Sequence, residues 1–227
     1  MQKIRIKDRE IEAHYFQGGD GPKPGIIFLH DLTGIQASTL NTAEIIAKNG
    51  YHVLVPDLFG ELGMPQYCLR ILFDKIALTN EEGNVGLEEI QDLIDAFKSF
   101  PEVISDRLGF VGQCLTGGYV LHAALRSEIK APILFHHSLG LTGSGFPDSC
   151  AGRLKNTVQA HFSNFDLLCP PWRANALEKQ LGSRLKRYDY NLPHAIPHLF
   201  QLNDEGRRAF DNMMGFFKEH LRESPQA

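Results

Sequence analysis

The feature that most constrains the fold of this chain is a regular alternation of short apolar runs with amphipathic segments. The runs "PGIIFLHD" (24–31) and "YHVLVPDL" (51–58) are almost continuously apolar, as in strands that are covered on both faces of a parallel sheet. The segments 38–50 and 84–100 instead space their apolar residues as amphipathic helices do. This order predicts an α/β fold: a mostly parallel central sheet flanked by helices on both faces.

The same alternation continues along the rest of the chain. The opening "KIRIKDREIEAHYF" predicts one or two strands, and 59–79 predicts a loop with a short helix. Ser38 or Thr39 is expected to cap the first long helix and Gly50 to end it. The whole of 1–227 is expected to form one domain, with a flexible tail at about 222–227. Further strands are expected at 107–114, 131–138, 156–163 and 184–191, and further helices at 117–126, 171–182 and 204–221.

Composition narrows the class of protein. A hydrophobic content of 43% and a net charge of −4 are typical of a globular protein and give no reason to expect nucleic acid or an anionic membrane as a partner. The charged, alternating start is unlike a secretory signal peptide, and no apolar run approaches the roughly 20 residues of a membrane span. We therefore expect a cytoplasmic protein with reduced thiols. The four cysteines form no C-x-x-C pair, which argues against a zinc ribbon or a redox motif.

The stretch "GFVGQCLTGG" (109–118) allows three interpretations of Cys114. A phosphate-binding loop would need lysine where Gly118 stands and a serine or threonine where Tyr119 stands. A buried thiol is the ordinary role of a free cysteine, and it suffices for the other three cysteines. A nucleophile on a sharp strand-to-helix turn needs small residues around it, which Gly112 and Gly117 supply. The third interpretation has the most support.

Partners for such a nucleophile follow in a suitable order. Asp166 comes directly after the strand expected at 156–163, and His194 and His198 come after the strand expected at 184–191. The order nucleophile, acid, histidine is that of α/β-hydrolases, and catalytic groups collect at the carboxyl ends of parallel strands. Asp189 is the competing acid, but its place on the last strand favours a solvent-facing side chain.

These motifs together resemble the dienelactone hydrolase family of α/β-hydrolases, which uses a Cys-Asp-His triad. The likeness covers nearly the whole chain. "GIIFLHDLTGIQ" and "AEIIAKNGYHVLVPDLFG" resemble the family's first long strand, first helix and "PDLF" strand end. "GFVGQCLTGG" resembles its G-x-C-x-G-G turn, "FDLLCPP" its acid loop and "HLF" its H-x-F histidine segment.

The resemblance implies a role for each matching residue. Cys114 would be the nucleophile, His198 its base and then the acid for the leaving group, and Asp166 the residue that orients the imidazole. The backbone N–H groups of Leu32 and Leu115 would form the oxyanion hole. His198 is preferred to His194 because only His198 is followed by x-Phe. His194 is then expected in a supporting or surface position.

Other positions next to the expected site either match the family or depart from it. Asp31 takes the place of an acidic residue that lies close to the resting thiol in the family, and His30 could lie at the mouth or bond to backbone. Thr116 stands where the family has glycine, so it could crowd the turn or donate its hydroxyl. Leu202 stands where members acting on dienelactone have a carboxylate-binding arginine four residues after the histidine. Arg70 or Arg207 could substitute for that arginine, but no sequence feature supports either, so an uncharged ester or lactone is at least as well supported as dienelactone.

These expectations define a function and its rivals. We expect a hydrolase of a small-molecule ester or lactone that works through a thioacyl-enzyme, without a metal or organic cofactor, as a monomer or small homo-oligomer. The spacing of His194 and His198 could suggest zinc, but Pro193 and Pro197 disfavour a regular helix there. An acyltransferase or thioesterase on the same fold, and a non-catalytic binding protein that kept the fold, are the alternatives.

Overall fold

The computed structural model describes residues 1–76, 84–137 and 143–221, and within them eight strands form one sheet. The order across the sheet is β1–β2–β4–β3–β5–β6–β7–β8. The first two strands pair antiparallel, β2 pairs antiparallel with β4, and all later neighbours are parallel. The strands are β1 (Gln2–Ile6), β2 (Arg9–Phe16), β3 (Lys23–Phe28), β4 (His52–Pro56), β5 (Val103–Gln113), β6 (Ile129–Phe135), β7 (Val158–Ser163) and β8 (Leu185–Tyr190). The predicted α/β fold with a mostly parallel sheet is confirmed.

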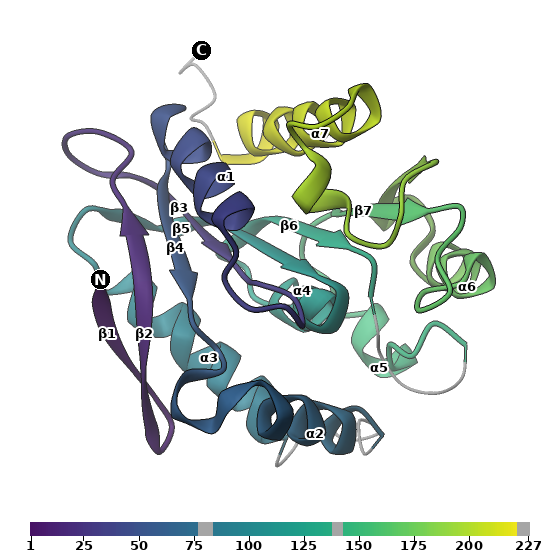
Figure 1. Ribbon diagram of the computed structural model, residues 1–227, viewed down its shortest axis with the longest axis horizontal. Helices are drawn as coiled ribbons and strands as arrows, with labels where there is room; N and C mark the ends of the chain where they lie inside the picture. The colour runs from purple at the N-terminus through teal and green to yellow at the C-terminus, as the bar shows by residue number, and fades with distance from the viewer. Residues whose placement is uncertain (77–83, 138–142, 222–227) are drawn as a thin grey trace.

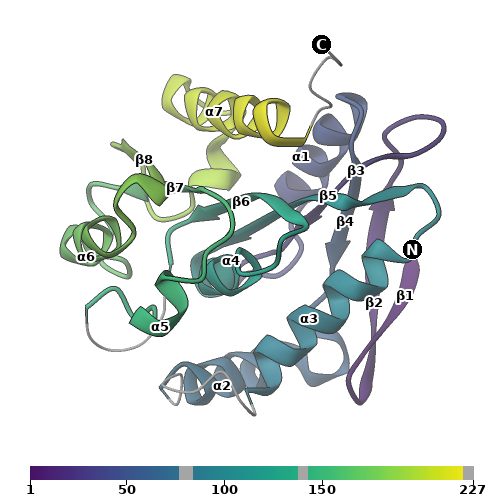
Figure 2. The same cartoon turned by 180° about the vertical axis from the view of Figure 1, so that it is seen from behind.

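Helices cover both faces of the sheet (Figures 1 and 2). The long helices α1 (Ala37–Lys48) and α7 (Asp204–Leu221) lie on one face, and α3 (Val85–Lys98) and α4 (Gly117–Ala123) lie on the other. The apolar side of α6 (Pro171–Leu181) joins the second face near β7 and β8. The remaining helical segments are α2 (Gly63–Ile76), α5 (Asp148–Ala151) and the 3₁₀ turns η1 (Gly60–Leu62), η2 (Cys114–Thr116), η3 (Gly182–Arg184) and η4 (Ile196–Leu199).

The continuous apolar run of β3 explains why both faces can be covered. Successive side chains of a strand point to opposite sides. Ile27 and Leu29 therefore enter the core under α3 and α4, while Ile26 and Phe28 enter the core under α1 and α7. All four are fully buried, and each buried aliphatic or aromatic side chain contributes about 1.5–3 kcal/mol to the folded state.

The parallel arrangement also determines where functional side chains gather. β3, β5, β6, β7 and β8 are consecutive neighbours and run in one direction, so their carboxyl ends lie along one edge of the sheet. The residues that follow these five ends are Asp31, Cys114, His136, Asp166 and His194.

The structure corrects two local expectations. The short helix expected in 59–79 is a turn followed by the 14-residue α2. Neither Ser38 nor Thr39 caps α1: the N-cap is Gln36, and Ser38 lies in the first turn with its hydroxyl directed elsewhere. Gly50 ends the helix as expected, with a positive φ of 91° that suits glycine. The expected tail at 222–227 lies outside the described residues.

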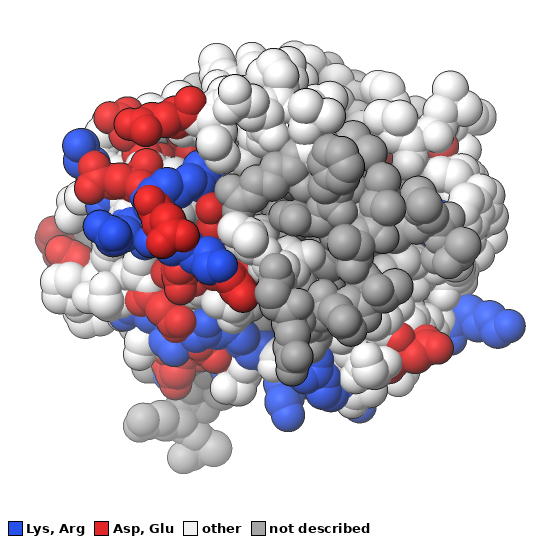
Figure 3. All heavy atoms as spheres, turned by 90° about the horizontal axis from the view of Figure 1, so that it is seen from below, with Lys and Arg blue, Asp and Glu red and all other residues white. Residues whose placement is uncertain are grey.

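Charged residues of both signs are mixed on the surface. Figure 3 shows Lys and Arg interspersed with Asp and Glu over one side of the face seen from below. The described part of this face has no separate basic region of the kind that binds a polyanion.

Candidate active site

Cys114 stands on a strained turn between β5 and α4. Its φ is +51°, which is uncommon for a residue with a side chain, and such strain occurs mainly where the surroundings force it. Two glycines make the turn possible. A Cβ on Gly112 would lie 2.6 Å from the Thr116 carbonyl oxygen, and one on Gly117 would lie 1.9 Å from the carbonyl oxygen of His136. The turn has the geometry predicted for a nucleophile between a strand and a helix.

Thr116 supports this turn instead of crowding it. Its side chain is buried, and its Oγ1 accepts a hydrogen bond from the backbone N–H of Gln113 at 3.0 Å. The same hydroxyl lies 3.1 Å from the carbonyl oxygen of His30 and 3.0 Å from that of Gln113, and it can donate to either. Thr116 therefore ties the turn to the end of β3.

Asp166 bonds to His194 and not to His198. The Oδ2 of Asp166 accepts a hydrogen bond from His194 Nδ1 at 2.6 Å. Its Oδ1 accepts from the backbone N–H groups of Leu168 and Cys169, at 2.8 and 2.9 Å, which fixes the carboxylate within its own loop. The Cys114 thiol interacts with the same imidazole. The three side chains of the expected nucleophile, acid and base thus meet, with His194 as the histidine.

Electrostatics strengthen this chain of contacts. Burial acts to lower the pKa of His194, but hydrogen bonds with Asp166 and Cys114 outweigh it and raise that pKa to about 10. Burial acts to raise the pKa of Asp166, but the nearby imidazoles of His136 and His194 hold it far below its usual value. Asp166 is therefore ionised at neutral pH, and it favours the imidazolium form of His194.

His198 takes a different set of partners, so the prediction that it pairs with Asp166 is wrong. Its Nε2 donates to Asp31 Oδ2 at 2.8 Å, and its Nδ1 lies 2.7 Å from the Ser38 hydroxyl of α1. The position four residues after the histidine of the acid–histidine pair is accordingly His198 and not Leu202. Leu202 is 72% exposed.

Asp31 organises the turn that follows β3. Its Oδ1 accepts from the backbone N–H and the hydroxyl of Thr33, at 2.8 and 2.6 Å. Burial acts to raise the pKa of Asp31, but the hydrogen bonds from His198 and Thr33 lower it to about 2. The carboxylate that was expected near the thiol is thus held by its own turn and by His198.

His30 lies beneath this turn and not at the mouth of the site. The side chain is fully buried, and its Nε2 accepts from the backbone N–H of Leu58 at 3.1 Å. Nδ1 therefore carries the proton and donates to the Asp31 carbonyl oxygen at 2.8 Å. Burial lowers the pKa of His30, so the ring is neutral. The interpretation as a strand-end histidine bonded to backbone is the one that the structure supports.

The two expected oxyanion donors lie on neighbouring segments of the chain. Leu115 is the residue after the nucleophile, and Leu32 lies in the turn 31–34, one residue beyond Asp31. The Thr116–His30 contact and the pairing of β3 with β5 hold these two segments next to each other. Their catalytic role stays a prediction.

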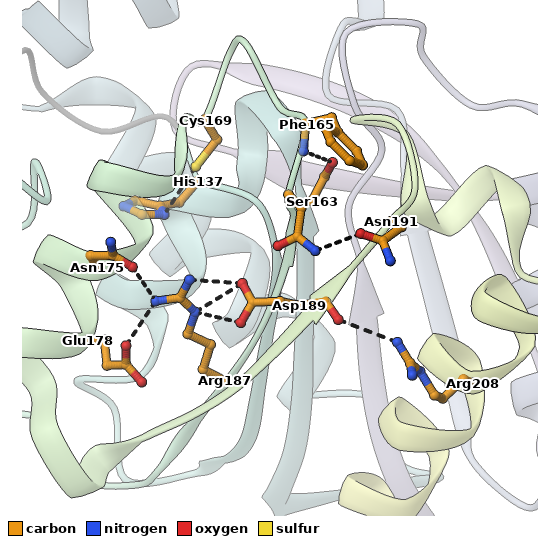
Figure 4. A network of polar contacts seen from close by, with 11 residues as sticks. His137, Ser163, Phe165, Cys169, Asn175, Glu178, Arg187, Asp189, Asn191 and Arg208 are labelled. Carbon is orange, nitrogen blue, oxygen red and sulfur yellow. Dashed lines mark hydrogen bonds and ion pairs between the residues drawn. The ribbon is translucent and has the colours of Figure 1, made fainter.

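The competing acid lies elsewhere. Asp189 bonds through both carboxylate oxygens to Arg187, which also contacts Glu178 and Asn175 (Figure 4). Asp189 is exposed on β8, as expected. Figure 4 also shows Cys169, whose sulfur lies 3.9 Å from His137 Nδ1.

A buried histidine from the pair His136–His137, which the sequence places at a strand end, completes the site. His136, at the end of β6, places its Nδ1 2.8 Å from Asp166 Oδ2 and stacks its ring on His194 with the centroids 4.5 Å apart. His136, Asp166 and His194 are by residue type a set that could hold a metal ion, with ligand atoms within 4.8 Å of one another. The one signal in the sequence was the His-His pair at a strand end.

Comparisons with known proteins identify the family of this chain. The family model described as "Dienelactone hydrolase family" matches residues 11–220. This chain belongs to the dienelactone hydrolase family. Members of this hydrolase family share the α/β-hydrolase fold seen here. None of the curated proteins matches the sequence.

Solved structures resemble this dienelactone hydrolase family member at low identity. A dienelactone hydrolase-like promiscuous phosphotriesterase from metagenomic libraries superposes with a TM-score of 0.78 at 19% identity, covering 97% of this chain and 98% of that one. Dienelactone hydrolase from Anabaena variabilis gives 0.67 at 17%, covering 97% of each chain. An acylaminoacyl peptidase from Pyrococcus horikoshii gives 0.76 at 17%, covering 100% of this chain and 42% of that one. At these identities the likeness shows the fold alone. No helix in the described residues is long and apolar enough to cross a membrane.

Proposed function

We propose that this member of the family hydrolyses a small uncharged ester or lactone, with Cys114 as nucleophile, His194 as base and Asp166 as the residue that orients it. The observation that carries the proposal is the hydrogen bond between Asp166 and His194, beside Cys114 on a strained turn at a helix start. The electrostatic interaction between His194 and Cys114 supports the same assignment. A protein that only binds a ligand has no need of all three groups in this arrangement.

The first half of the reaction forms a thioacyl-enzyme. The thiolate of Cys114 attacks the carbonyl carbon of the substrate, and the carbonyl oxygen becomes an oxyanion. The N–H groups of Leu32 and Leu115 stabilise this charge, each by about 3–4 kcal/mol in the transition state. The intermediate collapses, the alkoxide leaves, and it takes a proton from the His194 imidazolium. Asp166 keeps the imidazole ring oriented throughout.

The second half releases the acid. Neutral His194 removes a proton from water, which attacks the thioester carbon and forms a second tetrahedral intermediate. Collapse expels the Cys114 thiolate, and the His194 imidazolium remains beside it. Because a thioester is itself an activated acyl group, substrates with good leaving groups, such as enol esters, lactones and thioesters, are expected to react best.

The surroundings favour an uncharged substrate. His198 stands where a carboxylate-binding arginine would stand four residues after the base, but its Nε2 already donates to Asp31 Oδ2 at 2.8 Å. The acid loop beside Asp166 instead presents exposed apolar side chains. These are Phe165, Leu167, Leu168 and Trp172.

The experiment compares hydrolysis of p-nitrophenyl acetate and of a neutral lactone by the wild type and by single variants. Cys114→Ala and His194→Ala should each lose at least about 1,000-fold in kcat. His198→Ala should retain activity within about 30-fold, because it acts only through the turn 31–34. Cys68→Ala, a cysteine of α2, is the matched control and should hydrolyse both substrates like the wild type.

Two other outcomes favour the alternatives. Faster turnover with an added alcohol or amine, with the acyl group recovered on the acceptor, would indicate an acyltransferase. Equal inactivity of the wild type and all variants, with no enhanced alkylation of Cys114 by iodoacetamide, would contradict the proposal in favour of a binding protein.

A further inference from the structure

His136 is fully buried and contacts three parts of the proposed site. Its Nδ1 lies 2.8 Å from the Oδ2 of Asp166, the same oxygen that binds His194. Its ring stacks on His194 at an interplanar angle of 21°. Its carbonyl oxygen fills the space that a Cβ on Gly117 would occupy, 1.9 Å away. One residue thus contacts the acid, the base and the turn that carries the nucleophile.

The backbone of His136 is strained. Its φ is +59°, a left-handed conformation that is unfavourable for a residue with a side chain. The residue is nevertheless held rigidly, because its N–H donates to the His161 carbonyl oxygen at 2.9 Å and its side chain is fully buried. Strain that persists in a buried strand end indicates that the direction of this side chain matters.

The ring of His136 is neutral. Burial lowers the pKa of His136 more than the nearby Asp166 carboxylate raises it, and a positive His194 opposes a second charge. A neutral imidazole whose Nδ1 faces a carboxylate oxygen carries its proton on that nitrogen. The 2.8 Å contact lies outside the angles of a well-aligned hydrogen bond, so small rotations of the His136 ring or of the Asp166 carboxylate change it.

We propose that His136 is a positioning residue of this site: its Nδ1–H and its stacked ring hold the Asp166 carboxylate and the His194 imidazole in the orientation that Cys114 needs. Only the expected effect on ester hydrolysis rests on the proposed function; the positioning of Asp166 and His194 does not. Without the donor, Asp166 can turn toward its own loop, where Leu168 and Cys169 already bond its other oxygen. His194 then loses its fixed direction.

The test separates the donor from the ring. His136→Asn retains an N–H donor and suits a positive φ, whereas His136→Phe retains a stacking ring without a donor. We expect His136→Phe to lower kcat roughly 10- to 100-fold with little change in KM, and His136→Asn to recover most of this loss. His52→Gln is the matched control. His52 is also fully buried, but it bonds to the backbone of Gly18, and its replacement should leave kcat unchanged.

A second readout needs no substrate, so it stands even where ester hydrolysis is absent. The rate of iodoacetamide alkylation of Cys114 at neutral pH should fall in His136→Phe and recover in His136→Asn. If the wild type does not hydrolyse the esters but the alkylation rate still falls in His136→Phe and recovers in His136→Asn, the proposed function is rejected and the positioning role of His136 is retained. The role of His136 would be overturned if the folded Phe and Asn variants were both alkylated at Cys114 as fast as the wild type. It would also be overturned if both variants were slowed by the same factor.

A measurement on the wild type covers the case in which the variants do not fold. Long-range ¹H–¹⁵N spectra of the histidine-labelled protein report which ring nitrogen carries the proton. We expect the Nδ1–H tautomer for His136 throughout the neutral range. An Nε2–H tautomer would place no donor on Asp166 and would overturn the proposal.

Discussion

At the scale of single residues, the two histidines of one short loop differ in role because they differ in partner. His194 precedes the turn η4 and meets Asp166 at the end of β7, whereas His198 lies within η4 and meets Asp31 and Ser38. Residues four apart share a face in a regular helix or an extended strand, and the segment 191–195 is neither. Here the chain is not helical at His194, so the two rings reach different strand ends.

Thr116 provides a prediction at this scale. Thr116→Val should destabilise the protein by about 1–3 kcal/mol, since the Gln113 N–H and the His30 carbonyl oxygen lose a buried partner. Thr116→Ser keeps the hydroxyl and should cost much less. Urea unfolding of the three proteins measures the difference, and a valine variant as stable as the wild type would show that the hydroxyl does not support the turn.

At the scale of elements, the turn between β5 and α4 works because the end of β6 passes directly against it. The start of α4 can lie so close to His136 only when residue 117 has no side chain. The same approach places His136 over the acid and the base. The turn of the nucleophile and the position of the acid are therefore coupled through one backbone contact.

Gly117 tests this coupling. Gly117→Ala would place its Cβ 1.9 Å from a backbone oxygen, so α4 or the end of β6 must move. We expect a loss of stability of at least about 2 kcal/mol and a loss of most activity. Gly215→Ala, in α7 with nothing within 4 Å of its Cβ, is the control and should stabilise by about 0.5–1 kcal/mol. A Gly117→Ala protein with wild-type Tm and kcat would contradict the close approach.

At the scale of the whole molecule, five neighbouring strand ends bring ionisable groups from distant parts of the chain to one edge of the sheet. The folded state thereby shifts the pKa values of Asp31, His136, Asp166 and His194. These shifts link stability to pH.

The sign of the link between stability and pH differs between His194 and Asp31. The pKa of His194 is raised from 6.5 to about 10, so its contribution is complete below 6.5 and disappears as pH rises toward 10. The pKa of Asp31 is lowered from 3.8 to about 2, so its contribution is complete above 3.8 and disappears as pH falls toward 2. The free energy of unfolding of the wild type should therefore exceed that of His194→Ala by more at about pH 6 than at about pH 9. Urea unfolding at both pH values measures this, and an equal difference would contradict the raised pKa.

The order of elements was determined by the sequence itself. Apolar runs that are continuous in β3 and β4 and helical in spacing in α1 and α3 leave few ways to bury them, so the α/β sheet and the strand ends followed from local pattern. The glycines around Cys114 likewise indicated a sharp turn, because a turn of that shape excludes a Cβ. Asp166 could be placed at a strand end because it directly follows the strand expected at 156–163.

The choice of partners was decided only by the tertiary structure. Whether Asp166 meets His194 or His198 depends on distances across the sheet between β7 and the loop after β8, and spacing along the chain does not encode those distances. The role suggested for His136 depends on a left-handed backbone and a neighbouring strand, and neither leaves a mark in the local sequence. Short-range preferences thus specify the elements, whereas contacts between residues far apart in the chain specify the site.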